Sequence, residues 1–164
     1  MNEKRRLLGM TLDELKGVAF EAGLPGYAAK QMADWLYKKK VTSIAAMTNI
    51  ASAKRALLEK NFEVGAVPPS DLMKSVDGTI KYLYPAGPGN FVESVYIPTE
   101  DRATLCVSSQ VGCKMNCLFC MTGKQGFTKN LSANEILNQI QSLPETEELT
   151  NIVFMGMGEP LDNV

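Results

Sequence analysis

Histidine is absent from this 164-residue chain. Without it, no Ser-His-Asp triad, histidine general base or mixed Cys/His zinc site can form among these residues. Long apolar runs are missing too, since none approaches the roughly 20 residues that a membrane-spanning helix needs. The first ten residues, MNEKRRLLGM, give way to polar residues too soon for a secretion signal. We therefore predict a cytoplasmic protein with no membrane partner.

The composition, with 45% hydrophobic residues, is that of a globular protein with one ordinary domain or two small ones. A formal net charge of −1 conceals an asymmetry between the two ends. Residues 1–65 hold 11 Lys and Arg against 7 Asp and Glu, whereas residues 66–164 hold 6 against 11. A basic front suits an anionic partner such as RNA, and an ordinary solvated surface explains the excess equally well.

Helical signals dominate the front of the chain. Thr11 and Glu14 form a capping box before an apolar stripe that ends at a Gly-Leu-Pro-Gly stop. Two further helices are expected at residues 27–40 and 52–61. We predict a helical accessory domain over residues 1–66 that could bind RNA. Three lysines at the end of the second helix could contact RNA phosphate or form a solvated helix terminus: Lys38, Lys39 and Lys40.

The periodicity changes to that of strands after residue 66. Strands expected at residues 72–76, 79–84 and 91–97 form an antiparallel meander, and we predict that residues 67–100 serve as a linker. From residue 101 the pattern reads strand, loop, helix and strand, and a capping box of Ser132 and Glu135 starts the helix. Such a crossover indicates parallel strands and an α/β fold. Because the chain stops after the second parallel strand, we expect an amino-terminal fragment.

Three of the four cysteines, Cys113, Cys117 and Cys120, follow the spacing Cys-x3-Cys-x2-Cys. Three thiolates on one tight loop can each bind one iron of a [4Fe-4S] cluster, which leaves the fourth iron open for a substrate. Structural zinc with Cys106 as the fourth ligand is the alternative. Zinc sites usually show two short cysteine pairs, so one dense triplet favours the cluster.

The segment CKMNCLFC at residues 113–120 matches the signature of the radical S-adenosylmethionine (SAM) superfamily. Three blocks, CVSSQVGC at 106–113, TGKQGF at 122–127 and FMGMGEPL at 154–161, resemble the RlmN family more narrowly. That family methylates adenine in large-subunit ribosomal RNA and in transfer RNA. The helical front and the hairpin at residues 75–79 are also similar to the family's accessory region, so the resemblance covers nearly the whole chain.

The resemblance implies that residues 101–164 begin a partial (β/α)6 barrel, truncated here, with the cluster loop after the first strand. It further implies SAM as a second cofactor and an electron donor such as flavodoxin or ferredoxin. Phe119 would pack near the SAM adenine or the cluster, with a plain core role as the alternative. Glu159 and neighbouring glycines would hold the methionine ammonium. The cofactor-binding residues expected in this way are Phe119, Gly156, Gly158, Glu159 and Pro160.

The resemblance also gives Cys106 a catalytic role, as base and thiol partner in resolving a protein–RNA crosslink; alone in an apolar strand, it could equally be inert packing. In that scheme a second cysteine near the carboxy terminus carries the methyl group. All four cysteines here are already assigned, so we expect this fragment to be inactive alone. Lys124 and Lys129 could contact RNA phosphate or be ordinary surface residues. We expect a monomer.

Three other interpretations remain. A Cfr-type enzyme would methylate carbon 8 of adenine, although the blocks at 106–112 and 158–160 are more similar to the carbon 2 enzymes. A zinc-bearing RNA-binding module would combine the basic front with four thiolates and have no catalysis. A truncated product would also be non-catalytic.

Overall fold

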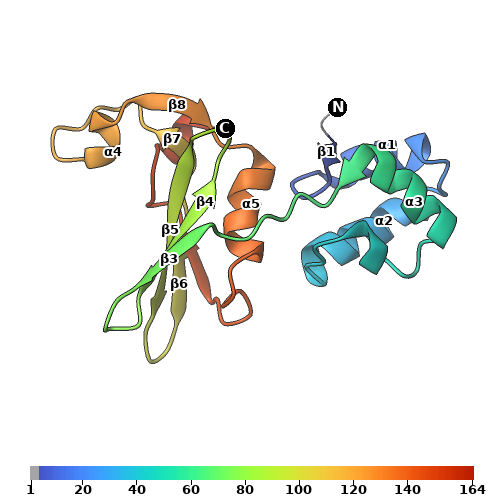
Figure 1. Ribbon diagram of the computed structural model, residues 1–164, viewed down its shortest axis with the longest axis horizontal. Helices are drawn as coiled ribbons and strands as arrows, with labels where there is room; N and C mark the ends of the chain where they lie inside the picture. Colours follow the sequence, from blue (N-terminus) through green and yellow to red (C-terminus); the bar gives the residue numbers. More distant parts are fainter. Residues whose placement is uncertain (1–3) are drawn as a thin grey trace. The chain divides into compact units, whose positions relative to one another are not determined.

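The computed structural model describes residues 4–164 and divides the chain into two compact units. The first unit ends at Ala66, and the second spans Val67–Val164 (Figure 1). Among the described residues, no helix has the length and apolar character needed to cross a bilayer.

The first unit is built from short helices. They are α1 (Leu12–Glu21), α2 (Tyr27–Ala33), the π-helix η1 (Asp34–Lys38), the 3-10 helix η2 (Ile44–Ala46) and α3 (Ser52–Asn61). The predicted Thr11 capping box is confirmed, because its hydroxyl accepts the Glu14 N–H while the Glu14 carboxylate accepts the Thr11 N–H. The single helix expected over residues 27–40 is wrong in its second half. It widens at Asp34, whose carbonyl accepts the N–H of Lys39, and stops before Lys40, which has φ +49°.

Two very short strands close the helical unit. β1 (Arg5–Arg6) pairs in parallel with β2 (Phe62–Glu63). Beyond them, the Leu7 N–H donates to the Glu63 carbonyl and the Leu8 N–H to the Val64 carbonyl. The Arg5 guanidinium lies 4.9 Å from the centre of the Phe62 ring. The sequence did not predict this pairing, since strands of two residues show no periodicity.

The second unit contains a five-stranded sheet in the order β3-β4-β5-β6-β9. The strands are β3 (Asp71–Lys74), β4 (Ile80–Pro85), β5 (Phe91–Pro98), β6 (Ala103–Cys106) and β9 (Asn151–Val153). The first three form the expected meander, which joins the sheet of β6 and β9. β6 and β9 are parallel, and α5 (Ala133–Gln141) lies between them in the sequence. This βαβ unit confirms the predicted α/β class.

The core of this unit lies between α5 and one face of the sheet. Tyr82, Tyr84 and Leu105 are fully buried there, and Ile136 and Ile140 of α5 pack against the cluster. The tyrosine hydroxyls reach the segment that follows α5. Tyr82 donates to Glu145 at 2.7 Å, and Tyr96 donates to Glu148 at 2.6 Å. The crossover is therefore bonded to the meander through side chains.

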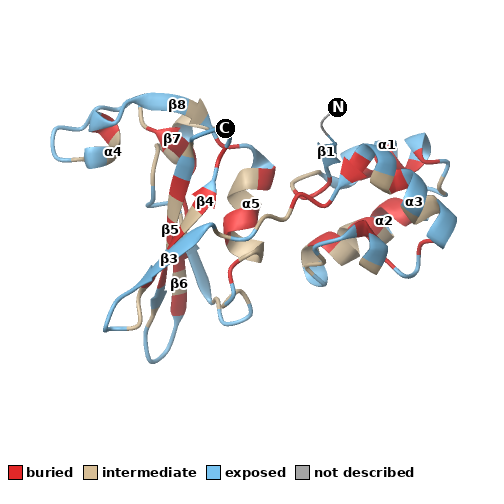
Figure 2. Ribbon diagram, in the orientation of Figure 1, coloured by how far each residue is buried: buried red, intermediate tan, exposed pale blue. Residues whose placement is uncertain are grey.

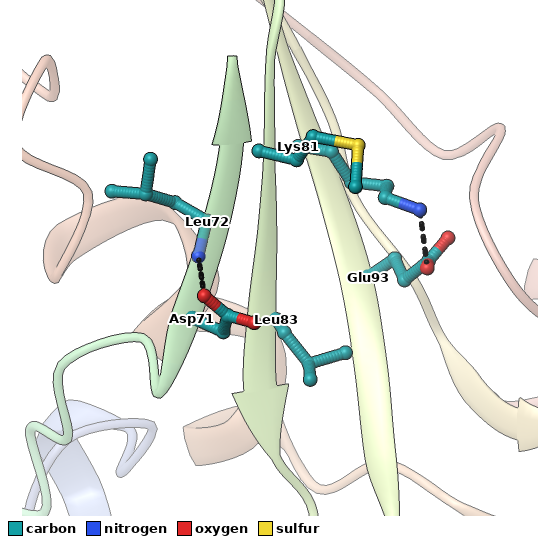
Figure 3. Close-up of a pocket in the computed structure, with 6 residues that line it drawn as sticks. Asp71, Leu72, Lys81, Leu83 and Glu93 are labelled. Carbon is teal, nitrogen blue, oxygen red and sulfur yellow. Dashed lines mark hydrogen bonds and ion pairs between the residues drawn. The ribbon is translucent and has the colours of Figure 1, made fainter.

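The opposite face of the sheet is partly open. Figure 3 shows a shallow pocket over β3, β4 and β5, across which Lys81 and Glu93 form an ion pair of 2.9 Å. Alternation along the strands explains it, because successive side chains point to opposite faces. The other residues that line this pocket are Asp71, Leu72, Met73 and Leu83.

A second, small sheet extends from the end of β6. β7 (Gln110–Gly112) pairs antiparallel with β8 (Phe127–Asn130), and the short helix α4 (Met121–Lys124) precedes β8. In Figure 1 these elements project beyond one end of the large sheet, and Figure 2 shows that their outer segment is exposed whereas β7 is buried. The sequence indicated only a loop here.

Candidate functional site

The cysteine triplet lies on the loop that β7 and β8 close. Gln110 pairs with Asn130 and Val111 with Lys129, and a bulge shifts the register before Gly112. The Cys113 N–H then donates to the Gly126 carbonyl at 3.3 Å. Residues 113–125 therefore leave from, and return to, one hydrogen-bonded base. We call residues 113–120 the cysteine loop.

Glycines allow the base of the cysteine loop to be this tight. Gly112 has φ +76°, and a Cβ at this position would lie 1.7 Å from the Gly126 carbonyl oxygen. Gly123 in α4 lies under the loop, where an added Cβ would be 3.1 Å from the Asn116 Cα. Side chains at these two positions would push the loop outward.

The three thiols of the cysteine loop carry no disulfide. Cys117 is exposed, and Cys113 and Cys120 are half-buried. The backbone N–H groups of Gly123 and Thr122 lower the pKa of the Cys120 thiol, which favours the thiolate that binds metals. The chemistry of this donor set therefore fits three irons of a cluster. Within residues 4–164, no group of three or more cysteine or acidic side chains is placed so that it could hold a metal ion.

Two apolar side chains in the cysteine loop are almost fully exposed. Phe119 is 92% exposed, as is Leu118, so the core role considered for Phe119 is not found. An exposed aromatic beside a ligand can contact a bound cofactor, whereas it contributes nothing to the packing of the chain.

The Gly-rich turn, residues 156–160, follows β9 and lies against the segment between β6 and β7. The Gly156 N–H donates to the Val107 carbonyl at 3.1 Å, and the Gln110 N–H donates to the Met157 carbonyl at 3.2 Å. A Cβ on Gly156 would lie 2.7 Å from the Val107 carbonyl oxygen. A Cβ on Gly158, which has φ +99°, would lie 2.7 Å from the Gln110 nitrogen. The approach thus requires glycine at both positions.

Gln110 connects the Gly-rich turn to the base of the cysteine loop. Its side chain is fully buried, and its carbonyl accepts the Glu159 N–H at 2.9 Å. Its amide nitrogen lies 2.9 Å from Asn130 Oδ1 and 2.8 Å from Asp162 Oδ2. The same Asp162 oxygen is 3.0 Å from the Lys114 ammonium in the cysteine loop. The Lys114 ammonium has the largest effect on the pKa of the Asp162 carboxyl and lowers it below its usual range. The hydrogen bond from Gln110 lowers this pKa further.

Sequence analysis did not assign a role to Gln110, Lys114 or Asp162. One signal was available, because Gln110 is a long polar residue within a short, otherwise apolar strand. Its partner Asp162 is 52 residues away in the sequence, and no periodicity links such positions.

Cys106 is the last residue of the first parallel strand, and Glu159 follows the second. Cys106 ends β6, pairs with Val95 and Val153 and is half-buried. Burial raises the pKa of its thiol more than the backbone N–H of Met155 lowers it, so the resting thiol holds its proton at neutral pH. Glu159 caps the short helix η3 (Pro160–Asp162), and its Oε1 accepts the Leu161 N–H at 3.1 Å.

The lysines expected to contact RNA have different environments. Lys129 pairs with Glu135 at 2.6 Å, and Lys38 pairs with Asp34 at 2.8 Å. The Lys39 ammonium lies 3.5 Å from the centre of the Trp35 ring. Lys124 is exposed on α4. An anionic ligand would have to compete with these carboxylates for Lys38 and Lys129.

Two family models match the chain. Residues 5–64 match the family described as the ribosomal RNA large subunit methyltransferase N-terminal domain, and residues 107–164 match the radical SAM superfamily.

Curated relatives match over the full length of the chain. A probable dual-specificity RNA methyltransferase RlmN from Parabacteroides distasonis is 82% identical over 164 residues, which are 100% of this chain and 48% of the relative. One from Bacteroides thetaiotaomicron is 65% identical with the same coverage. The chain thus spans about half the length of these relatives. A solved radical SAM methyltransferase from Sphaerobacter thermophilus is 38% identical, with a TM-score of 0.86 over 97% of this chain and 48% of that one.

Proposed function

We propose that this chain, which belongs to the RlmN family, is the cluster-binding amino-terminal half of an enzyme that methylates carbon 2 of an adenine in ribosomal and transfer RNA. One observation carries the proposal most directly. The loop with the Cys-x3-Cys-x2-Cys spacing follows the first parallel strand, and the Gly-rich turn after the second is hydrogen-bonded to its base through Gln110. Both segments lie beyond the carboxyl ends of their strands, where α/β enzymes bind ligands.

Cys113, Cys117 and Cys120 would each hold one iron of a [4Fe-4S] cluster. Such a cluster, when bound, offers an open iron to the amino and carboxylate groups of SAM and one electron to its sulfonium. The chain's own share is to present three thiolates, and the lowered pKa of Cys120 supports this. The Glu159 carboxylate suits an ammonium group, and the backbone of its neighbours Gly156, Gly158 and Pro160 would complete the proposed SAM site. Phe119 supplies an aromatic face beside the thiols.

Cys106 is the proposed catalytic thiol. It ends β6, and its half-buried side chain holds a proton at neutral pH because burial raises its pKa. To act as a base, Cys106 must first lose that proton. It would therefore enter the reaction as a protonated thiol and become a base only after deprotonation. Because this proposal gives the four cysteines present other roles, the methyl-carrying cysteine would lie outside residues 1–164. This fragment would therefore be inactive alone.

The proposed partners are ribosomal and transfer RNA substrates and a cytoplasmic electron donor such as flavodoxin or ferredoxin, with the protein a monomer. Replacing Lys38, Lys39 and Lys40 with alanine should weaken RNA binding and reduce its salt slope by about 2, since each lost phosphate contact in a single strand removes about 0.7. A charge-matched variant with Lys4, Lys16 and Lys60 replaced should bind almost as the parent does. Equal loss in the two variants would mean that only net charge matters.

The cluster is tested by anaerobic reconstitution of the chain with iron and sulfide, followed by electron paramagnetic resonance of the reduced protein. We expect a [4Fe-4S] signal that shifts when SAM is added. Cys117→Ala should abolish the signal, whereas Cys106→Ala, which changes a cysteine outside the triplet, should keep it. Tight binding of about one zinc per chain with no cluster signal would instead support the RNA-binding module. Methylation at carbon 8 by the full-length protein would support the Cfr-type alternative.

A further inference from the structure

We propose that Gln110, Asp162 and Lys114 form a two-stage brace that positions the cysteine loop against the Gly-rich turn. In this brace the bond from Gln110 to Asp162 is the fixed stage, and the ion pair from Asp162 to Lys114 is the adjustable stage. That the two segments carry a cluster and SAM rests on the proposed function. The mechanical coupling itself rests only on contacts within the second unit.

The fixed stage is centred on a buried amide, and each polar atom of that amide has a partner. Gln110 is fully buried, and its amide uses its oxygen for the Glu159 N–H and its nitrogen for Asn130 and Asp162. Asp162 is held from its other side too, because its carbonyl accepts a hydrogen bond from the Asn130 side chain at 3.3 Å. Because the Gln110 side chain is buried, breaking its hydrogen bonds would leave polar atoms without water or another partner, which resists opening.

The next residue strengthens the fixed stage. The Asn163 side-chain nitrogen donates to the Ser109 carbonyl at 2.8 Å and to the Leu131 carbonyl at 2.9 Å. The segment after the Gly-rich turn is thus bonded to the residue that precedes β7 and to the residue that follows β8. The Asp162 carboxylate therefore keeps its place when the cysteine loop moves.

The adjustable stage is half-exposed. The side chains of Lys114 and Asp162 are 48% and 28% exposed, and water can replace either partner of such a pair at small cost. The Lys114 ammonium is also 4.4 Å from the centre of the Phe127 ring, so it lies between the turn and the start of β8. Lys114 adjoins Cys113 directly. A shift of the first thiol would therefore act on this half-exposed ion pair before it acts on the bond between Gln110 and Asp162.

This order of strength would let the cysteine loop adjust its position without displacing the Gly-rich turn. The Gly-rich turn is bonded through its main chain at several points, whereas Lys114 joins the cysteine loop to Asp162 through a half-exposed ion pair. The flexible side chain of Lys114 lets the cysteine loop move while the Gly-rich turn stays in place. Lys114, Gln110 and Asp162 are thus positioning residues rather than catalytic ones.

Hydrogen–deuterium exchange of the chain without a cluster tests the two stages separately. Lys114→Met should speed exchange about fivefold or more in the cysteine loop and leave residues 156–161 unchanged. Gln110→Glu keeps the shape and the acceptor but cannot donate to Asp162, so it should speed exchange in both segments. The double variant Gln110→Glu with Asp162→Asn reverses the donor and acceptor of the bond between these two residues. It should restore slow exchange in the Gly-rich turn but not in the cysteine loop, because an asparagine at position 162 cannot form an ion pair with Lys114. Lys81→Met, which breaks the exposed pair with Glu93, is the control and should change neither segment.

Two results would overturn the brace. One is a cysteine loop that exchanges at the parent's rate in Lys114→Met, and the other is a turn that does so in Gln110→Glu. After reconstitution, Lys114→Met should keep its iron content but bind SAM more weakly, as read from the resonance shift. A parent chain that takes up no cluster would count against the proposed function, while the exchange results would still decide the brace.

Discussion

At the residue scale, glycines set how closely the Gly-rich turn approaches the strand ends. Gly156 and Gly158 lie against backbone atoms of Val107 and Gln110, at distances that leave no room for a methyl group. The short turn can therefore hydrogen-bond with its main chain to residues 107–110. Any side chain at these positions would lift the turn off the Gln110 amide.

We expect Gly158→Ala to destabilise the second unit. Its φ of +99° alone costs a residue with a Cβ about 1–3 kcal/mol, and the clash with Gln110 adds to this. Urea unfolding measures the loss. Gly17→Ala is the matched control, because Gly17 lies in α1 with open space around it, and alanine there should stabilise its helix by about 0.5–1 kcal/mol. Parent-like stability of Gly158→Ala would contradict the close approach.

Cys106 should react with iodoacetamide only at raised pH. Burial raises its pKa, so the reactive thiolate becomes abundant at a higher pH than in the unfolded chain. Peptide mass spectrometry after brief labelling at a series of pH values gives the midpoint, with the same series in urea as the control. Coincident midpoints in the folded and unfolded chain would show that the strand end does not perturb this thiol.

Single residues show how far the sequence could lead. The spacing of Cys113, Cys117 and Cys120 pointed to metal chemistry because the ligands are local in sequence. Gln110 and Asp162 could not be paired in this way, since their contact depends on how β6 and β9 align. The alignment follows from packing over the whole sheet, which no local pattern records.

At the element scale, helix starts are the best-encoded feature. Both capping boxes predicted from Thr11 with Glu14 and from Ser132 with Glu135 are present. Each satisfies backbone N–H groups that the first helical turn leaves unpaired, using residues three positions apart. The π-helical turn at Asp34–Lys38 and the strands β1, β2, β7 and β8 were missed, because their hydrogen bonds join positions that show no apolar period.

Ser132→Ala should cost the second unit about 1 kcal/mol, which is typical for the loss of an N-cap hydroxyl. Hydrogen exchange at the start of α5 reports the change locally, and urea unfolding reports it globally. Thr11→Ala is the matched control, since it removes the equivalent hydroxyl from α1 in the other unit. If Ser132→Ala speeds exchange in α1, or Thr11→Ala does so in α5, the two caps do not act locally.

At the scale of the whole molecule, stability should depend on pH in opposite senses at the two extremes. Two of the carboxylates with pKa values below the usual range are Asp34 and Glu135. The hydrogen bond from Lys38 lowers the pKa of Asp34. Burial raises the pKa of Glu135, but hydrogen bonds from Lys129 and Ser132 lower it by more. Their stabilisation is present above the unfolded values of about 4 and is lost as the pH falls through the folded ones. The hydrogen bond to Glu148 raises the pKa of Tyr96 to about 12. Its contribution is present below about pH 10, the unfolded value, and is lost as the pH rises.

We therefore expect the urea midpoint to be highest between about pH 5 and pH 9. Glu135→Gln should lower the maximum urea midpoint and reduce its fall at acid pH. The reason is that the glutamine carries no carboxylate whose charged form folding could favour. Tyr96→Phe should flatten the alkaline limb and leave the acid limb unchanged. A chain whose midpoint does not vary from pH 3 to pH 11 would show that these pairs contribute little to folding.

The parallel pairing of β1 with β2 has a consequence for the order of folding. It joins Arg5–Arg6 to Phe62–Glu63, so nearly the full length of the helical unit lies between its partners. The unit therefore has a high contact order at its ends, and the entropy of closing so long a loop makes this pairing a late kinetic step. It also brings residues 5 and 64 to within on the order of 10 Å, given the rise per residue of a strand. A few residues of linker would thus suffice to cyclise this unit or to open new termini elsewhere in it.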